Sequence, residues 1–423
     1  MQARTEPKPN EDDYEDDDED ESDYDYEDDD AGAPKGSPVL VAYRCPASAL
    51  RRGEWLFLRF LLYCAGPLHY GRQGTRSADA RQPTVMKTNP YLTAFIGLLP
   101  FALAGWTQAA DTVVYQGKQG PGQGKHIVFL AGDEEYRSEE GLPMLAKILA
   151  VRHGFKCTVV FPINPANGTI DPLILTNMPG IAALDSADVC VMGLRFRELP
   201  DSQMRHFADY LNAGKPVIAL RTSTHAFKYD HNQASTYAKY DWYSPKWTGG
   251  FGQQVLGETW VNHHGNHGVE STRGVINEAF KDNPVLRGVT DVWCPTDVYT
   301  VSHLPKDATV LMWGQVLLGM KPTDPPVEGP KNHPMMALVW LRDYKGEGGK
   351  TSKICTTTMG AAVDLENEGL RRLLVNAAYW AAGLEDQIPA RANVDYVGEY
   401  KPNWFGFGKF KPGLKPEDLA LPE

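Results

Sequence analysis

The stretch Lys215-Pro-Val-Ile-Ala-Leu-Arg-Thr-Ser-Thr-His-Ala-Phe227 decides the fold of this chain. Its apolar run, Val217 to Leu220, is followed at once by five polar residues that begin at Arg221. A short apolar run that ends in polar residues is typical of a buried parallel strand that delivers side chains to the edge of an α/β sheet. Because a guanidinium is not a nucleophile, Arg221 excludes nucleophilic catalysis at the first position after this strand.

Apolar strands and amphipathic helices alternate on both sides of this stretch. The predicted strands are 126–132, 157–161, 187–194, 217–220, 308–313, 335–341 and 352–358, and the predicted helices are 138–154, 200–212 and 366–382. Continuous apolar strands that alternate with amphipathic helices indicate a parallel sheet covered on both faces. The sequence therefore predicts a single α/β domain with a doubly wound, mostly parallel, flavodoxin-like sheet.

The first 110 residues differ in composition from the rest of the chain. Sixteen of the twenty residues from Glu11 to Asp30 are Asp or Glu, which predicts a disordered acidic segment. Met86 opens a second pattern, with Lys87 followed by an apolar run from Leu92 to Ala104 and small residues near Ala109. This is the layout of a secretory signal peptide. We interpret 1–85 as a leader from an over-extended gene model and 86–110 as a signal peptide that starts at Met86.

Export to the periplasm or the extracellular space is therefore expected, with no membrane span left after cleavage. The Gly/Gln-rich range 111–124 is predicted to be a linker, 125–388 the α/β domain and 389–423 an irregular C-terminal tail. Without the first 110 residues, 31 Lys and Arg stand against 35 Asp and Glu, a net charge of −4 compared with −12 for the whole chain. Such a balance argues against nucleic acid as a partner. It does not predict an oligomeric state.

Four cysteines follow the predicted signal peptide. Cys157, Cys190 and Cys355 lie in apolar, strand-like runs, which favours buried free thiols. A bridge that involves Cys294 stays open.

Polar residues gather where the predicted strands end, and ligands bind at that edge of such sheets. The candidates are Asp133, Glu134, Arg195, Arg221, Thr222 and His225. Arginine can bind a substrate oxygen, and a carboxylate or histidine can accept a proton. We expect Arg221 to polarise a substrate oxygen, His225 to move a proton and Asp133 to orient them. A Ser223 nucleophile is disfavoured, because no Gly-x-Ser-x-Gly motif surrounds it.

A second cluster lies in the irregular region that follows, where His263, His264 and His267 fall within five residues. Histidine suits proton transfer near neutral pH, and His264 and His267 could share a divalent metal ion, although the spacing matches no established zinc motif. No cofactor is predicted. Trp260 and Tyr243 belong to an aromatic-rich insertion, and aromatic faces fit the C–H face of a sugar or pack on each other.

The ordered motifs of residues 125–383 resemble the trehalose-utilisation (ThuA-like) family, whose fold is class I glutamine amidotransferase-like. The matching pieces are Pro216–Thr224, Gly249-Gly250-Phe251, Asn283-Pro284-Val285, Thr296-Asp297-Val298-Tyr299, Ala337-Leu338-Val339-Trp340 and Asn376–Gly383. The family usually has a histidine where this chain has Arg221, and a Gly-His pair where it has Gly360-Ala361. The chain is therefore similar to a divergent subgroup, and without an elbow cysteine it is not a glutamine amidotransferase.

The resemblance implies that the chain acts on a carbohydrate or a sugar-derived carbonyl compound, and it adds Asp297 and Tyr299 to the candidate site. We expect acid/base chemistry by Arg221, His225 or His264, and Asp133 or Asp297. One alternative is a carbohydrate-binding protein without catalysis. The other is a metal-dependent hydrolase built on the His263 to His267 loop.

Overall fold

The computed structural model describes residues 111–422, and the predicted acidic leader and signal peptide lie outside the described residues. The strands are β1 Thr112–Gln116, β2 His126–Gly132, β3 Lys156–Val160, β4 Val189–Leu194, β5 Val217–Leu220, β6 Thr272–Ile276, β7 Trp293–Cys294, β8 Thr309–Val316, β9 Met336–Lys345 and β10 Thr351–Thr357. The α-helices are α1 Ser138–His153, α2 Asp201–Asn212 and α3 Glu368–Ala381. Short helical turns join them: η1 Pro179–Ser186, η2 Arg221–His225, η3 Ala238–Tyr240, η4 Gly252–Leu256, η5 Glu278–Phe280, η6 Pro284–Leu286, η7 Val363–Glu366, η8 Glu385–Gln387 and η9 Pro416–Leu419.

The strands form one mixed sheet in the order β1-β3-β2-β4-β5-β10-β9-β8-β6-β7. β3, β2, β4, β5 and β10 are parallel, whereas the pairs from β10 to β7 and the β1–β3 pair are antiparallel. The predicted α/β class is confirmed, but the sheet is mixed and not mostly parallel. Only residues 346–350 separate β9 from β10, which permits a hairpin but no crossover helix.

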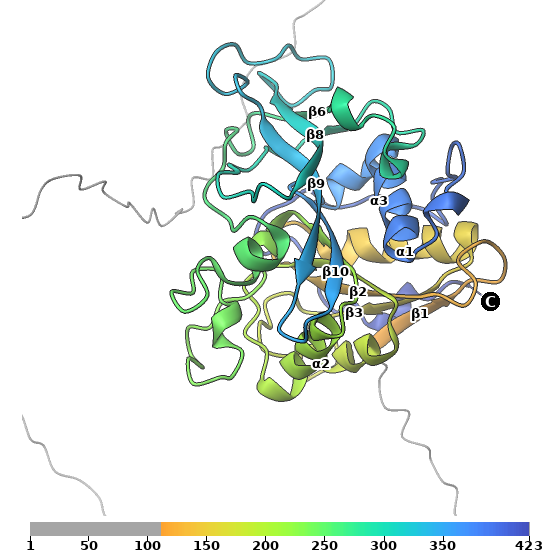
Figure 1. Ribbon diagram of the computed structural model, residues 1–423. Coiled ribbons are helices and arrows are strands. Elements are labelled where there is room, and N and C mark those ends of the chain that lie inside the picture. The colour runs from red at the N-terminus through yellow and green to blue at the C-terminus, as the bar shows by residue number, and fades with distance from the viewer. Residues whose placement is uncertain (1–110, 423) are drawn as a thin grey trace, which may run out of the picture. The chain divides into compact units, whose positions relative to one another are not determined.

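Each face of the parallel strands is covered by a different layer. Ile127 and Phe129 of β2 pack in the cluster that contains α1 and α3, whereas Val128 and Leu130 pack in the cluster that contains α2. Figure 1 shows α1 and α3 on one side of β2 and β3, and α2 on the other. Burial on both faces explains why these strands read as unbroken apolar runs in the sequence. Residues 111–422 fall within one compact unit.

Three strands were not expected. β1 occupies the start of the range 111–124, which the sequence predicts to be a linker, and it pairs with β3 at the edge of the sheet. Val113 and Tyr115 of β1 are buried, whereas Val114 between them is exposed. Only the inward-facing positions of this strand therefore require apolar side chains. β6 and β7 are short strands of the antiparallel half. The tail from residue 389 is irregular apart from η9.

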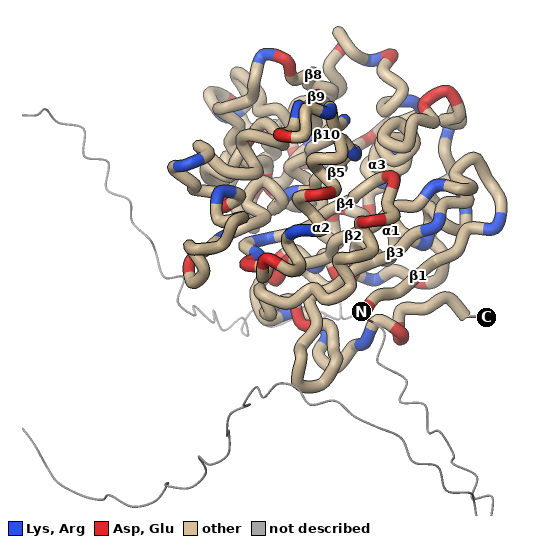
Figure 2. The backbone as a smooth tube through the Cα atoms, turned by 60° about the horizontal axis from the view of Figure 1, so that its bottom comes forward, with Lys and Arg blue, Asp and Glu red and all other residues tan. Residues whose placement is uncertain are grey.

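The surface carries both signs of charge. Figure 2 shows Lys and Arg intermixed with Asp and Glu over the described elements. Among residues 111–422 no helix has both the length and the apolar character to cross a membrane. The four cysteines in this range, including Cys294, are free and buried.

Candidate functional site

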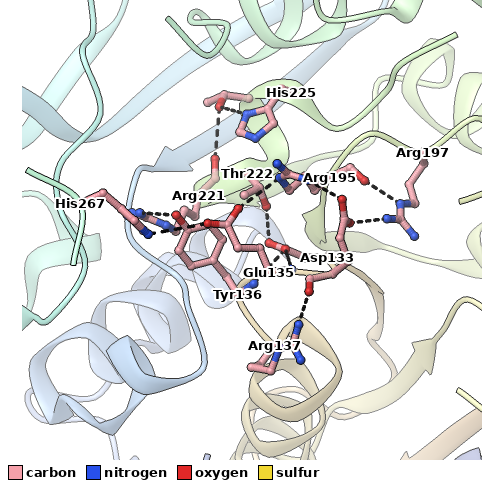
Figure 3. A network of polar contacts seen from close by, with 12 residues as sticks. Asp133, Glu135, Tyr136, Arg137, Arg195, Arg197, Arg221, Thr222, His225 and His267 are labelled. Carbon is pink, nitrogen blue, oxygen red and sulfur yellow. Dashed lines mark hydrogen bonds and ion pairs between the residues drawn. The ribbon is translucent and has the colours of Figure 1, made fainter. Parts of the chain in front are cut away.

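The carboxyl ends of β2, β4, β5 and β10 meet at one edge of the sheet. Gly132 pairs with Leu194 across β2 and β4, and Leu220 pairs with Thr357 across β5 and β10. The polar residues that follow these strands therefore converge, as expected for a parallel α/β sheet. Figure 3 shows the resulting network, with His267 on one side of Glu135 and Arg195 on the other.

Arg221 lies at the elbow after β5, and its side chain is directed into the protein. Its backbone has a φ of 40°, a left-handed conformation that is strained for a residue other than glycine. The guanidinium donates to the carbonyls of Asp297 (2.9 Å) and Thr358 (3.0 Å), to the Tyr136 hydroxyl (3.0 Å) and to Oδ1 of Asp297 (3.0 Å). The rings of Tyr136 and Tyr299 cover it at 4.1 and 4.5 Å. We correct the expectation that Arg221 polarises a substrate oxygen, because its side chain is buried and engaged within the protein.

Asp297 joins the elbow to the histidine loop. Its Oδ2 accepts a hydrogen bond from Nδ1 of His263 (2.7 Å), and its Oδ1 accepts one from Nδ1 of His267 (2.9 Å). Because a carboxylate only accepts, each Nδ1 carries a hydrogen, so Nε2 is the nitrogen of each ring that can exchange a proton. The two imidazoles lie side by side with their centroids 4.6 Å apart, and about a third of each side chain is exposed.

The charge of Asp297 is fixed by its surroundings. Burial raises the pKa of this carboxyl, but Arg221 and the hydrogen bonds from His263 and His267 outweigh burial and hold the pKa well below its ordinary value. Asp297 is therefore ionised at any working pH. A buried carboxylate that stays negative and accepts a hydrogen bond from both imidazoles can fix the orientation of the two rings. It can also stabilise either imidazole when that ring gains a proton.

Glu135 faces His267 from the loop after β2. Its Oε1 lies 3.8 Å from Nε2 of His267, and its Oε2 lies 3.3 Å from Nε of Arg195. Burial, with a contribution from Asp133, raises the pKa of the Glu135 carboxyl, against the opposing effect of Arg195 and Arg221. A carboxyl group with a raised pKa, next to an imidazole and a cation, has the surroundings of a proton donor or acceptor.

Asp133 and Glu134 hold the loops in place. Oδ1 of Asp133 accepts from the backbone amides of Glu135 (2.8 Å) and Tyr136 (3.0 Å), and its Oδ2 accepts from the Thr222 hydroxyl (2.5 Å). This leaves Asp133 and Thr222 occupied with each other.

Glu134 is buried between two arginines. It pairs with Arg195, and its Oε2 lies 2.6 Å from Nη2 of Arg197. Glu134 is therefore engaged in ion pairs within the protein and not directed at a ligand. Arg195 remains partly exposed.

His225 is buried beside the aromatic insertion. Its Nδ1 lies 3.2 Å from the Thr224 hydroxyl, and its ring lies 5.0 Å from Phe196 and 5.6 Å from Trp260, centroid to centroid. Burial, with Arg195, Arg221 and His263 adding to it, lowers the pKa of His225 well below its ordinary value. His225 is therefore neutral at physiological pH.

The predicted aromatic residues lie beside the two histidines. The ring of His263 lies 5.9 Å from Trp260 and 5.5 Å from Tyr299. Trp260 contacts Trp242, whose neighbour Tyr243 is 75 % exposed at the end of this row. Tyr299 is buried against Arg221 and therefore supports the site from within the protein. Tyr243 is exposed and can contact a ligand.

The predicted catalytic residue His264 and the disfavoured nucleophile Ser223 are each occupied by hydrogen bonds within the protein. Nε2 of His264 lies 2.8 Å from the carbonyl of Lys331, and His264 is not among the described residues that hydrogen-bond to Asp297. His264 is therefore corrected from a catalytic residue to a structural one, and His263 takes its place. Ser223 is buried, donates to the Met192 carbonyl (2.9 Å) and accepts from the Leu194 amide (3.2 Å), which removes it as a nucleophile.

The residues that could hold a metal ion also differ from the predicted pair His264 and His267. Among the described residues, His263, His267 and Asp297 offer ligand atoms within 4.8 Å of one another. Two imidazoles and a carboxylate suit zinc or another transition metal by donor type. Both oxygens of Asp297 already accept hydrogen bonds, however, and one of them also pairs with Arg221.

Sequence reasoning missed three contributors. Glu135 was passed over for Glu134, since neighbouring carboxylates after a strand look alike until the loop conformation is known. Tyr136 caps Arg221, and Phe405 from the C-terminal tail packs 5.1 Å from the His267 ring. The one usable signal was the high density of aromatic residues in the tail.

Comparisons with known proteins add only a general likeness. No family model matches the chain, and no curated protein matches it. Among solved structures, a protein of Bacteroides uniformis described as ThuA-like is 15% identical, with a TM-score of 0.37 over 62% of this chain and 93% of the other. One from Parabacteroides merdae, also described as ThuA-like, is 14% identical, with a TM-score of 0.39 over 61% and 90%.

Proposed function

We propose that this chain is an enzyme that acts on a carbohydrate or a sugar-derived carbonyl compound by acid/base chemistry. The observation that carries the proposal is the buried Asp297 carboxylate, which accepts hydrogen bonds from Nδ1 of both His263 and His267. Arg221 donates a further hydrogen bond to the same carboxylate. A buried carboxylate that orients an imidazole through Nδ1 is the arrangement that makes Nε2 an effective base. The ThuA-like motifs and the neighbouring aromatic rings support a sugar as the substrate.

The roles follow from exposure and charge. His263 has no other polar partner among the described residues, so its Nε2 can take a proton from a substrate hydroxyl or from a carbon next to a carbonyl. Glu135 and His267 face each other at 3.8 Å and can return a proton to the product. Arg195 is the partly exposed cation of the site and can bind a developing negative oxygen, the task first expected of Arg221.

The test is turnover by the full chain on trehalose, maltose, cellobiose and their keto forms, followed by mass spectrometry. Asp297→Asn keeps the shape of the side chain and removes its charge, so we expect turnover to fall about 100-fold or more. His263→Gln should fall comparably. His264→Gln is the matched control in the same loop and should keep turnover.

Two outcomes would count against acid/base catalysis. Equal turnover by wild type and Asp297→Asn would reject the assignment of the site. A folded wild-type chain that binds these sugars in calorimetry but converts none of them would replace the enzyme with a carbohydrate-binding protein.

A metal-dependent hydrolase is the second candidate, favoured by the close approach of His263, His267 and Asp297. Bound metal would polarise a water molecule or a carbonyl oxygen there. Elemental analysis of purified protein decides between the two candidates. The hydrolase is supported if the protein contains about one equivalent of zinc, manganese or iron and if His267→Gln loses that metal. It is rejected if protein freed of metal with EDTA keeps its turnover.

We also propose that the chain is exported through the signal peptide at 86–110. Strand β1 begins at Thr112, so cleavage near Ala110 would leave the whole sheet intact. N-terminal sequencing of the protein from its native source should find a start at or near Asp111. Peptides from residues 1–85 in that material would contradict the proposal.

A further inference from the structure

A short piece of the C-terminal tail, Asn403–Phe407, is fastened to the loop that carries Glu135. The backbone amide and the side-chain amide of Asn403 donate to the carboxylate of Glu140 at 2.8 and 3.1 Å. Three residues later, the amide of Gly406 donates to the backbone carbonyl of Glu135 at 2.8 Å. This tail segment is therefore held at two points, one at the first turn of α1 and one at the site itself.

One ring of the tail segment points into the protein. Phe405 is 5% exposed, and its centroid lies 5.1 Å from the ring of His267 and 5.5 Å from that of Tyr136. Phe405 therefore forms part of the packing that sets the position of His267.

The rings on either side of Phe405 point outward. Trp404 is 46% exposed and stacks on Phe405 at 4.8 Å, and Phe407 is 60% exposed with its centroid 5.0 Å from the guanidinium of Arg195. A single exposed aromatic residue needs no explanation, but two lie within four residues here, and one of them, Phe407, lies against the partly exposed Arg195. Phe407 and this guanidinium form an apolar surface with a polar edge. Such a surface is suited to a ligand that is apolar on one face and hydroxylated at its rim.

Phe196, which follows β4, and two residues of the insertion form a second row of aromatic rings that begins at Arg195. The ring of Phe196 lies 4.5 Å from the Arg195 guanidinium, followed by Trp242 at 5.8 Å from Phe196 and by Tyr243 at 5.5 Å from Trp242. Arg195 thus contacts Phe196, at the start of a row of rings that ends in the exposed Tyr243, and also the exposed Phe407 of the tail. Glu135 contacts both Arg195 and His267 (Figure 3), so these aromatic rings adjoin the polar centre of the site.

We propose that the tail segment is one wall of the substrate site, and that Trp404 and Phe407 stack on a ring of the ligand next to the group that reacts. The inference rests on the proposed function, because it takes Glu135, His263 and His267 as the reacting centre. It assigns to residues outside the predicted α/β domain a part in positioning the substrate. Phe405 is a positioning residue for His267 and does not touch the ligand.

The experiment compares Phe407→Ala, Phe407→Tyr and Trp404→Ala in the full chain, on the sugar panel named above. Loss of one stacking face should raise KM about 3- to 10-fold and leave kcat within about twofold. Phe407→Tyr keeps the aromatic face and should restore KM. Phe280→Ala, which removes an exposed ring in η5, is the matched control and should leave KM unchanged. Thermal melting verifies that each variant is folded.

The outcomes separate this inference from the proposed function. If the wild type turns over a sugar and the KM is unchanged in both Phe407→Ala and Trp404→Ala, the tail segment is not a wall of the substrate site. The proposed enzymatic function is unaffected by that result. Binding without turnover, weakened by Phe407→Ala in calorimetry and restored by Phe407→Tyr, rejects the enzyme and supports the wall. A folded wild-type chain that neither binds nor converts any of the sugars overturns both.

Discussion

Arg221 brings a positive charge into a fully buried position at the strained elbow after β5. Its hydrogen bonds and its pairing with Asp297 compensate for the water it has lost, and the two tyrosine rings add cation–π contacts. Removing one partner of such a pair leaves the other charge buried and uncompensated.

Arg221→Met should therefore destabilise the protein by about 3–5 kcal/mol, because Asp297 loses its cation. The measurement is the free energy of unfolding in urea. Arg205→Met is the matched control, since Arg205 forms an exposed ion pair with Asp209 on α2 and should cost no more than about 0.5 kcal/mol. Equal losses in the two variants would show that the Arg221 network does not stabilise the fold.

His225 should remain neutral from pH 8 down to about pH 6. Burial and the nearby Arg195 and Arg221 lower its pKa, so its contribution to stability is full above about pH 6.5 and is lost as the pH falls through its folded pKa. Nitrogen chemical shifts of the ring, followed by NMR against pH, report its charge. The internal reference is the exposed His231, because a hydrogen bond from its ring to Glu198 raises the pKa of this histidine. His231 should therefore titrate first as the pH falls. A His225 ring that titrates alongside His231 would contradict the assignment.

The start of helix α1 contains a group whose ionisation should affect stability. Burial raises the pKa of Glu139 to about 8 and outweighs the opposing effect of Arg137, whose Nε lies 3.6 Å from Oε1 of Glu139. Its folded pKa exceeds its unfolded one, so its contribution is full below about pH 4.5 and is lost as the pH rises toward 8.

We expect the free energy of unfolding to fall between about pH 5 and 8, by at most about 1.4 kcal/mol per pH unit from this one group. Glu139→Gln should remove this slope, as measured by urea unfolding at each pH. Glu278→Gln, at an exposed position in η5, should preserve it. A slope that survives Glu139→Gln would assign it to other groups.

The sequence predicted the three α-helices and seven of the ten strands, and it missed β1, β6 and β7. The five parallel strands and three helices were expected because their apolar patterns are continuous or periodic. β1 and β6 lie in the outer part of the sheet with only part of each strand buried, and β7 is two residues long, so their patterns were too weak. The convergence of the strand-end loops followed from the order of elements. Which of two adjacent histidines or carboxylates faces the site depends on loop conformation, which local pattern does not encode.

At the scale of the whole molecule, the tail from residue 389 is part of the core despite its irregular path. Val394 and Ala392 are buried, and their carbonyls accept from the guanidinium groups of Arg371 and Arg372 on α3. The Asn393 carbonyl lies 2.7 Å from Nε2 of His153 at the end of α1. The tail thus covers α1 and α3 together.

Val394→Asp should therefore destabilise the protein by about 3 kcal/mol or more, since it buries a charge without a partner. Val269→Asp makes the same change at a site that is 58% exposed and should cost about 0.5 kcal/mol or less. Thermal melting and urea unfolding of both variants test this. Similar stabilities would place the tail outside the cooperative unit.

The tail also reaches the first strand of the sheet. The hydroxyl of Tyr115 in β1 donates to the carbonyl of Leu419 (2.9 Å), and the amide of Ile170 donates to the carbonyl of Leu414 (2.7 Å). Tyr115 and Leu419 are 304 positions apart in the sequence, and Ile170, in the loop after β3, contacts the same end of the tail. Loss of residues 414–422 would therefore remove a contact from the edge strand β1, at the other end of the described chain.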